Sequence, residues 1–114
     1  MKRGDIVIVD FSLSNPGAGI RPAVVVQNDR DNGRIQNTIV AQVTSNIRRA
    51  HEDTQLLIDQ THRDWQQSGL RLPSVINTSN LATVRQADIR HLIGSLSTTT
   101  LRLIDDCIRV ALQL

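Results

Sequence analysis

Arg21 and Thr44 are the two side chains of this sequence whose chemistry and predicted proximity suggest a site. Arg21 follows a loop rich in Ser, Gly, Asn and Pro (residues 12–20) and is itself followed by Pro22. A residue before proline is held in an extended conformation, which restricts the direction in which the Arg21 side chain leaves the backbone. A guanidinium presents a planar fork of donors that matches a phosphate, and a threonine hydroxyl can add another hydrogen bond.

A predicted hairpin brings these two side chains together. Residues 23–26 and 38–44 are apolar runs typical of strands, and a polar segment with an Asn-Gly pair separates them at 28–34. If the strands pair antiparallel, the residue that enters the first and the residue that leaves the second lie at the same end, so Arg21 and Thr44 become neighbours. On composition alone, an exposed arginine at a turn and a threonine at a strand end remain the simpler interpretation.

Other kinds of active site find little support. His51, His62 and His91 lack the short spacings of a zinc site, and no cluster of carboxylates resembles a magnesium or calcium loop, so we expect no metal. Cys107 is the only cysteine, which excludes an intrachain disulfide and a cysteine-based cluster. No Gly-x-Ser-x-Gly segment is present, so a Ser/His/Asp triad finds little support. The glycines at 17 and 19 lack the lysine of a nucleotide-binding loop, and we expect no cofactor.

The bulk composition fits one small unit. With 114 residues, 39% of them hydrophobic, the chain can bury one compact core, and we expect a single domain over residues 1–114. No run approaches 18 apolar residues and no signal-peptide pattern precedes the first strand, so we expect a cytoplasmic location and no membrane contact. The formal net charge is +2, and Lys2 is the only lysine among 13 basic residues. A nucleic-acid partner is allowed by this balance but not required.

The remaining pattern predicts a sheet followed by a helix. Val, Ile and Thr are frequent before residue 85, which favours strands. The apolar run at 5–11 predicts a strand covered on both faces. Further strands are expected at 54–59, 74–78, 81–84 and 92–96, and helical turns at 61–68 ended by Gly69. Apolar residues at helical spacing predict a helix from Leu101, buried on more than one side and capped by a residue within 98–100.

Four segments, taken together and in order, resemble the MazF/PemK toxin family. They are Arg-Gly-Asp-Ile-Val at 3–7, Arg-Pro-Ala-Val-Val-Val-Gln-Asn-Asp at 21–29, Val-Ala-Gln-Val-Thr-Ser at 40–45, and Ile-Gly-Ser-Leu-Ser at 93–97 before the Leu/Ile-rich helix. The resemblance covers nearly the whole chain. It implies a mainly β fold, a small SH3-like or CcdB-like β-barrel with a C-terminal α-helix. It also implies a homodimer that cleaves single-stranded RNA sequence-selectively, and a cognate antitoxin whose disordered tail covers the active groove.

The resemblance further implies roles for individual residues. In the family the 2′-hydroxyl of the RNA attacks the adjacent phosphate without a metal, leaving a 2′,3′-cyclic phosphate and a 5′-hydroxyl. Arg21 matches the family arginine after the first loop and Thr44 the threonine at the third strand end, so both are expected to act on that phosphate. Because the pKa of arginine exceeds about 12, charge stabilisation outweighs proton donation. The expected substrate contacts are Ser45, Asn46, Asn77, Ser79, Arg48 and Arg49.

Departures from the family pattern leave alternatives open. Some members place an arginine and an aspartate in the later strand as acid and base, where this sequence has Asn77 and Ser79, so the general base is unassigned. The first loop is short and lacks the acidic and glutamine residues common there. For Arg48 and Arg49, a solvated basic surface is an equally good interpretation. Two other functions stay open, a CcdB-like gyrase poison and an RNA-binding module without activity, although the poison relies on a terminal Trp-Gly-Ile and this sequence has Leu-Gln-Leu at 112–114.

Overall fold

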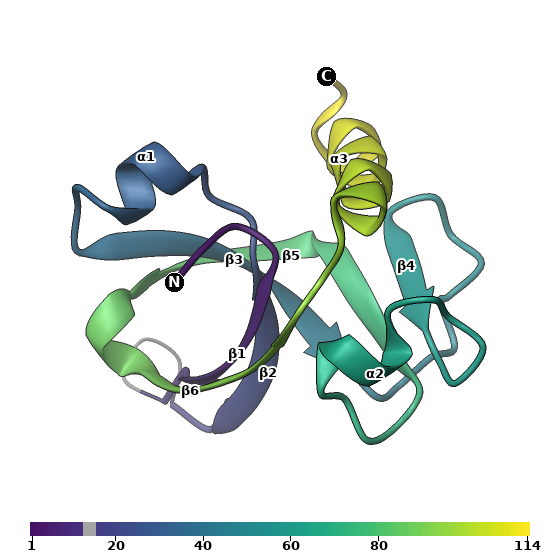
Figure 1. Cartoon of the computed structure of the whole chain (residues 1–114), viewed down its shortest axis with the longest axis horizontal. Helices are drawn as coiled ribbons and strands as arrows, with labels where there is room; N and C mark the ends of the chain where they lie inside the picture. Colours follow the sequence, from purple (N-terminus) through teal and green to yellow (C-terminus); the bar gives the residue numbers. More distant parts are fainter. Residues whose placement is uncertain (13–15) are drawn as a thin grey trace.

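The computed structural model describes residues 1–12 and 16–114. Six strands form one antiparallel sheet in the order β4-β5-β3-β2-β1-β6, and the sheet curls strongly on itself (Figure 1). The strands are β1 (Asp5–Asp10), β2 (Ile20–Val25), β3 (Asn37–Thr44), β4 (Gln55–Ile58), β5 (Ser74–Arg85) and β6 (Ile89–Ser95). The helical segments are α1 (Asp29–Asn32), α2 (Trp65–Ser68), the short 3-10 turn Gln86–Asp88 and α3 (Thr98–Leu112). The predicted CcdB-like β fold with a C-terminal helix is confirmed. The barrel is open, because β4 and β6 are the edge strands of the sheet and do not pair with each other.

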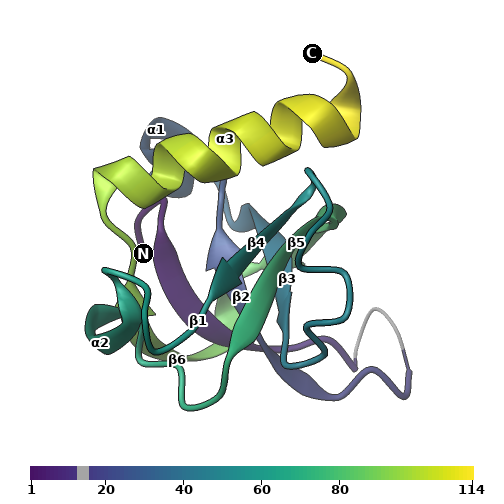
Figure 2. The same ribbon diagram turned by 90° about the vertical axis from the view of Figure 1, so that its right-hand side faces the viewer.

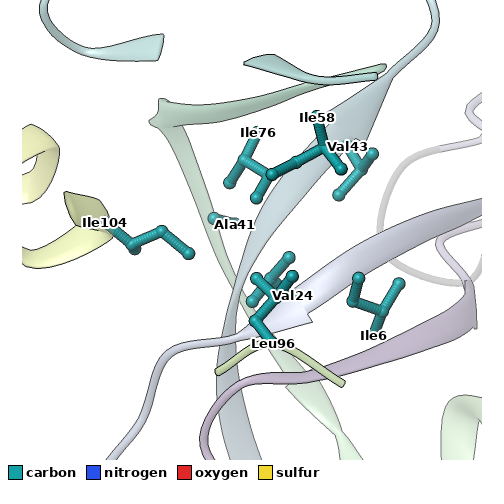
Figure 3. Packing of buried hydrophobic residues seen from close by; sticks show 8 residues of the cluster. All are labelled: Ile6, Val24, Ala41, Val43, Ile58, Ile76, Leu96 and Ile104. Atoms are coloured by element: carbon teal, nitrogen blue, oxygen red, sulfur yellow. The ribbon is translucent and has the colours of Figure 1, made fainter. Parts of the chain in front are cut away.

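Side-chain alternation along the strands separates two hydrophobic cores. In β1, Ile6 points to one core and Val7 and Val9 point to the other, and all three are fully buried. The larger core, drawn in Figure 3, consists of Ile6, Val24, Ala41, Val43, Ile58, Ile76, Leu96 and Ile104. The smaller core consists of Val7, Val9, Ala23, Val25, Val40 and Val84. The prediction that the first strand is covered on both faces is confirmed.

The helix α3 lies across the end of the sheet where β1 begins (Figure 2) and packs against β4 and β5. Ile104 joins the larger core, and Cys107 beside it on the same face is also buried. The prediction that this helix is buried on more than one side is wrong, because the sheet covers one face only. Leu103 and Val110 on the outer face are 45% and 50% exposed.

The cap of α3 also differs from the prediction by one residue. The Ser97 hydroxyl accepts a hydrogen bond from the backbone N–H of Thr100, so Ser97 is the N-cap and the helix already includes residues 98–100. Thr100 is buried beneath the first turn. A run of one serine and three threonines offers four possible caps, and tertiary packing of Thr100 selects the first.

The predicted pairing of β2 with β3 is confirmed, but the segment between them is not a tight turn. It contains α1, whose N-cap Asn28 accepts a hydrogen bond from the Asp31 N–H at 2.9 Å. Within the predicted loop 12–20, residues 13–15 lie outside the described residues, and Ile20 already belongs to β2.

Two predicted strands, 74–78 and 81–84, are one strand in the structure. β5 runs unbroken along β3, but its register shifts between the Ala41–Leu81 and Gln42–Asn77 pairs, so three extra residues, 78–80, bulge out of the ladder. The predicted helical turns at 61–68 end as α2 at Ser68, and Gly69 follows in the left-handed conformation, φ 71°.

Candidate functional site

The strands β2 and β3 separate at Pro22. Their pairing covers only Ala23–Val25 opposite Val40–Gln42. Pro22 comes next and has no N–H to donate to a ladder, which explains why the pairing stops there. Continuing the register by two residues places Arg21 opposite Thr44, and the strand alternation sends both side chains to the same face. Arg21 and Thr44 therefore lie at the same end of β2 and β3, as expected, but at a point where the two strands are no longer paired.

A pocket of about 690 Å³ lies at this opened end. Apolar residues, among them Ile8, Pro22, Val43 and Ile93, form much of its lining. Its polar lining consists of Arg21, Thr44, Ser45, Arg71 and Ser74. In the part of the chain that the structure describes, no carboxylate and no imidazole lines the pocket. Two positive charges with hydroxyl groups and no opposing charge suit an anion.

Within the described part of the chain, the Arg21 guanidinium is held by one hydrogen bond to the backbone. Its Nε donates to the Ala18 carbonyl oxygen at 2.7 Å, which orients the group beside the preceding loop. Among residues 1–12 and 16–114, no carboxylate forms an ion pair with Arg21, which lies exposed. Its two terminal amino groups are therefore placed to bind an anion in the fork geometry that suits a phosphate.

The Thr44 hydroxyl is oriented by the turn that follows β3. Its Oγ1 accepts a hydrogen bond from the Asn46 N–H at 3.1 Å, and the Asn46 side-chain oxygen accepts one from the Arg48 N–H at 3.2 Å. This local pattern uses one lone pair of the hydroxyl and leaves its proton available. Thr44 can thus donate a hydrogen bond to a group bound at the pocket.

A further wall of the pocket is formed by the segment from Gly69 to Leu72, which packs against β6. A side chain on Gly69 would place its Cβ 2.0 Å from the Ile93 carbonyl oxygen, and the positive φ of Gly69 also disfavours other residues. A Cβ on Gly94 would lie 2.3 Å from the Gln67 carbonyl oxygen. The two glycines let backbone pack directly on backbone, which fixes the segment that carries Arg71.

The buried carboxylate of Asp64 holds α2, the helix that precedes Gly69. Asp64, at the start of α2, accepts hydrogen bonds from the Ser97 N–H at 2.8 Å and the Ser97 hydroxyl at 2.9 Å. Burial would raise the pKa of Asp64, but hydrogen bonds from Thr100 and Ser97, with the nearby His62, outweigh it and hold the pKa below its ordinary value. The carboxylate therefore links the start of α2 to the start of α3.

Of the four substrate contacts expected after β3, the structure places one in the pocket lining. Ser45 lines the pocket, whereas Asn46 acts through the hydrogen bond to Thr44, and Arg48 is exposed outside the lining. Arg49 makes two hydrogen bonds to Glu52, at 2.7 and 2.9 Å. This contact raises the pKa of Arg49 and lowers that of the glutamate, so Arg49 is already occupied.

Asn77 and Ser79 lie at the β5 bulge rather than in the pocket lining. The Asn77 side-chain oxygen accepts hydrogen bonds from the Gln55 side chain at 2.9 Å and from the Ser79 N–H at 3.0 Å. Two polar residues of the pocket lining, Arg71 and Ser74, were not expected from the sequence. One of two arginines in a connection between strands is a weak signal, and only the fold brings Arg71 to the pocket that Arg21 lines.

Metal and thiol chemistry have no assembled site in the described residues. No group of three His, Cys, Asp or Glu side chains within 1–12 and 16–114 could hold a metal ion. The Cys107 thiol is buried in the α3 interface, and burial raises its pKa, as expected for a packing residue. Among the helices that the structure describes, none combines the length and hydropathy needed to span a membrane.

Comparison with known proteins agrees with this architecture. A family model described as the PemK-like, MazF-like toxin of type II toxin–antitoxin systems matches residues 2–112. The endoribonuclease EndoA of Bacillus subtilis is 28% identical over 116 residues, a match that covers 100% of this chain and 96% of EndoA.

Solved structures show the same fold. An endoribonuclease from Mycobacterial species, in complex with its cognate antitoxin, superposes with a TM-score of 0.79 at 19% identity, covering 100% of this chain and 96% of that one. The Mycobacterium tuberculosis toxin MazF-mt6 superposes with a TM-score of 0.79 at 23% identity, covering 96% of this chain and 97% of that one.

Proposed function

The chain belongs to the PemK-like, MazF-like toxin family of type II toxin–antitoxin systems, and on this premise we propose that it is a metal-independent, sequence-selective endoribonuclease acting on single-stranded RNA. The observation that carries the proposal is that Arg21 and Thr44 line one pocket at the opened end of β2 and β3, a pocket that no carboxylate of the described residues lines. The similarity to an endoribonuclease over the full chain supports it.

In the proposed reaction the RNA supplies its own nucleophile. The 2′-hydroxyl oxygen forms a bond to the adjacent phosphorus and loses its proton, while the bond from phosphorus to the 5′-oxygen breaks and that oxygen gains a proton. The products are a 2′,3′-cyclic phosphate and a 5′-hydroxyl. Negative charge grows on the phosphate oxygens as the new bond forms, so a fixed cation accelerates the step.

We assign electrostatic stabilisation to Arg21 and orientation to Thr44. The two terminal amino groups of Arg21 bind the phosphate as its charge develops. The Thr44 hydroxyl, held by the Asn46 N–H, donates to the same phosphate or orients the attacking hydroxyl. None of the described residues contributes an imidazole or a carboxylate to the pocket lining. We therefore attribute the rate acceleration to Arg21 and Thr44 and not to an acid–base pair.

The proposal includes partners and a location. We propose that the protein is a cytoplasmic homodimer and a single domain over residues 1–114, as the family resemblance implies. We also propose a cognate antitoxin that covers the pocket, supported by the structural likeness to an endoribonuclease bound to its antitoxin. Acidic side chains in such a partner would match the two arginines of the pocket. Sedimentation of the purified protein tests the dimer.

The decisive experiment for the activity is to incubate the purified protein with a long single-stranded RNA in EDTA and to map both ends of each product. Discrete cuts with cyclic-phosphate and 5′-hydroxyl ends support the proposal. Cleavage that EDTA abolishes would contradict metal independence. Intact RNA together with inhibited DNA supercoiling would instead identify a gyrase poison, and RNA binding without cleavage would identify an inactive module.

A further inference from the structure

Arg71 lies in the connection between β4 and β5 and lines the same pocket as Arg21. Resting on the proposed function, we propose that Arg71 binds a second RNA phosphate, next to the scissile one held by Arg21, so that the pocket holds one nucleotide between two phosphate contacts. Arg71 thus becomes a substrate-binding residue that the segments shared with the toxin family do not include.

The charge environment of Arg71 matches that of Arg21. Both side chains are exposed, and in the described part of the chain neither forms an ion pair. Six other arginines, outside the pocket, are paired with carboxylates: Arg3, Arg34, Arg49, Arg85, Arg90 and Arg109. Two unpaired guanidinium groups at one pocket create a positive potential, which favours the polyanionic backbone of RNA.

The backbone that carries Arg71 is anchored on both sides. Leu70 packs against the larger core, and Gly69 lies directly against the β6 backbone. On the other side, the Ser74 hydroxyl donates to the Leu72 carbonyl oxygen at 2.8 Å. Because the backbone of this segment is already fixed, it loses little conformational entropy when the Arg71 side chain binds a ligand.

The remaining lining fits the nucleotide between the two phosphates. The volume of about 690 Å³ lies within the range of small-molecule sites, about 300–1,000 Å³. Ile20 and Leu72 line the pocket and are 58% and 61% exposed, so both leave apolar surface open to a ligand. An unstacked base can cover this apolar surface, and the phosphate contacts fix its position.

The two arginines should then affect different kinetic constants. The phosphate bound by Arg21 gains charge in the transition state, so loss of Arg21 lowers kcat. The phosphate bound by Arg71 keeps the same charge throughout the reaction, so Arg71 contributes equally to substrate and transition-state binding. Its loss should raise KM and leave kcat nearly unchanged.

The test uses a short RNA that contains one mapped cleavage site and compares wild type with Arg71→Gln, Arg71→Lys and Arg63→Gln over a range of salt concentrations. Arg63→Gln is the matched control, because Arg63 is an exposed arginine of the same connection, lies outside the pocket lining and forms no ion pair with a described residue. For Arg71→Gln we expect KM to rise about tenfold, with kcat within about threefold of wild type. The plot of log kcat/KM against log salt should flatten by about 0.7, the share of one phosphate on a single strand. Arg71→Lys should retain the slope.

Three outcomes distinguish failure of this inference from failure of the proposed function. If wild type cleaves RNA and Arg71→Gln matches Arg63→Gln in KM and salt slope, Arg71 binds no phosphate. A fall in kcat at unchanged KM would also overturn the inference, because it would place Arg71 on the scissile phosphate. If wild type does not cleave RNA at all, the proposed function fails and the inference fails with it. Thermal unfolding of each variant verifies that the fold is retained.

Discussion

The two ends of the β1–β2 ladder each carry an arginine, and the arginines are used in opposite ways. At the end beneath α3 (Figure 2), Arg3 donates from Nε to the Val26 carbonyl oxygen at 3.1 Å and from a terminal amino group to Asp105. At the other end, Arg21 donates to one backbone oxygen and forms no ion pair with a described carboxylate. Arg3 therefore joins β2 to α3, whereas Arg21 is left with donors for a ligand.

The surroundings of the two arginines explain the difference. Near Arg3 the chain supplies acceptors from separate elements, including the Asp29 carboxylate, which accepts from the Arg3 N–H at 2.6 Å. Near Arg21 the lining is apolar or hydroxyl-bearing, and Pro22 opens the strand pair. The role of an arginine is thus determined by which carboxylates the fold brings to it, and residue type alone does not reveal it.

Replacement of Arg21 should produce the largest effect on activity and little effect on stability. Arg21→Ala removes the cation at the scissile phosphate, so we expect a loss of about a hundredfold or more in cleavage rate. The side chain is exposed, so the melting temperature should change by less than about 2 °C. Single-turnover cleavage and thermal unfolding measure the two quantities. An undiminished rate would contradict the assignment.

Replacement of Arg3 should show the reverse pattern. Arg3→Gln leaves Asp105 and the Val26 carbonyl without their partner, and we expect the free energy of unfolding to fall by about 2 kcal/mol. Cleavage measured well below the unfolding transition should stay within about threefold of wild type, because this end does not contact the pocket. Urea denaturation provides the stability. A loss of activity comparable to that of Arg21→Ala would break the contrast between the two ends.

Asp64 should make stability depend on acid pH. Because its folded-state pKa is depressed, the carboxylate stabilises the fold above its unfolded pKa, about 3.9, and this contribution is lost as the pH falls through the folded value. We therefore expect Asp64→Asn to cost about 1 kcal/mol at pH 7 and progressively less below pH about 4. Urea titrations of both proteins at several pH values measure this. An equal cost at every pH would refute the role of the charge.

Arg49 should show the smallest effect, although its position after β3 made it an expected RNA contact. Its donors are already bound by Glu52, so Arg49→Gln should change KM by less than about threefold. The ion pair is exposed, so its loss should change the free energy of unfolding by less than about 0.5 kcal/mol. Steady-state kinetics provide the readout. A tenfold rise in KM would show that Arg49 leaves Glu52 to bind RNA.

Local patterns in the sequence predicted most of the strands and the position of Arg21 and Thr44 at the same end of β2 and β3. The apolar run of β1 and the pairing of β2 with β3 depend on alternation and on an antiparallel return of the chain, which are properties of neighbouring segments. The cap of α3 and the continuity of β5 were predicted less well. Both depend on contacts with distant residues, with Thr100 packing in one case and β3 pairing in the other.

The composition of the pocket was harder to predict than its central pair. Arg71 reaches it because Gly69 and Gly94 allow two backbones to touch, and no periodicity in the sequence encodes this contact. Asn77 and Ser79 were expected near the site from their strand, but the bulge at 78–80 places them outside the pocket lining. Register shifts of this kind are invisible to a reading of strand propensities.

The central claim, that Arg21 and Thr44 act together on one phosphate, is tested most directly by a double-mutant cycle of cleavage rates with Arg21→Gln, Thr44→Val and the double variant. We expect losses of about a hundredfold and about tenfold for the single variants. The double variant should be no more than about threefold slower than Arg21→Gln, because groups that share one transition-state charge are not additive. Fully multiplicative losses, or a single variant with the wild-type rate, would contradict the account.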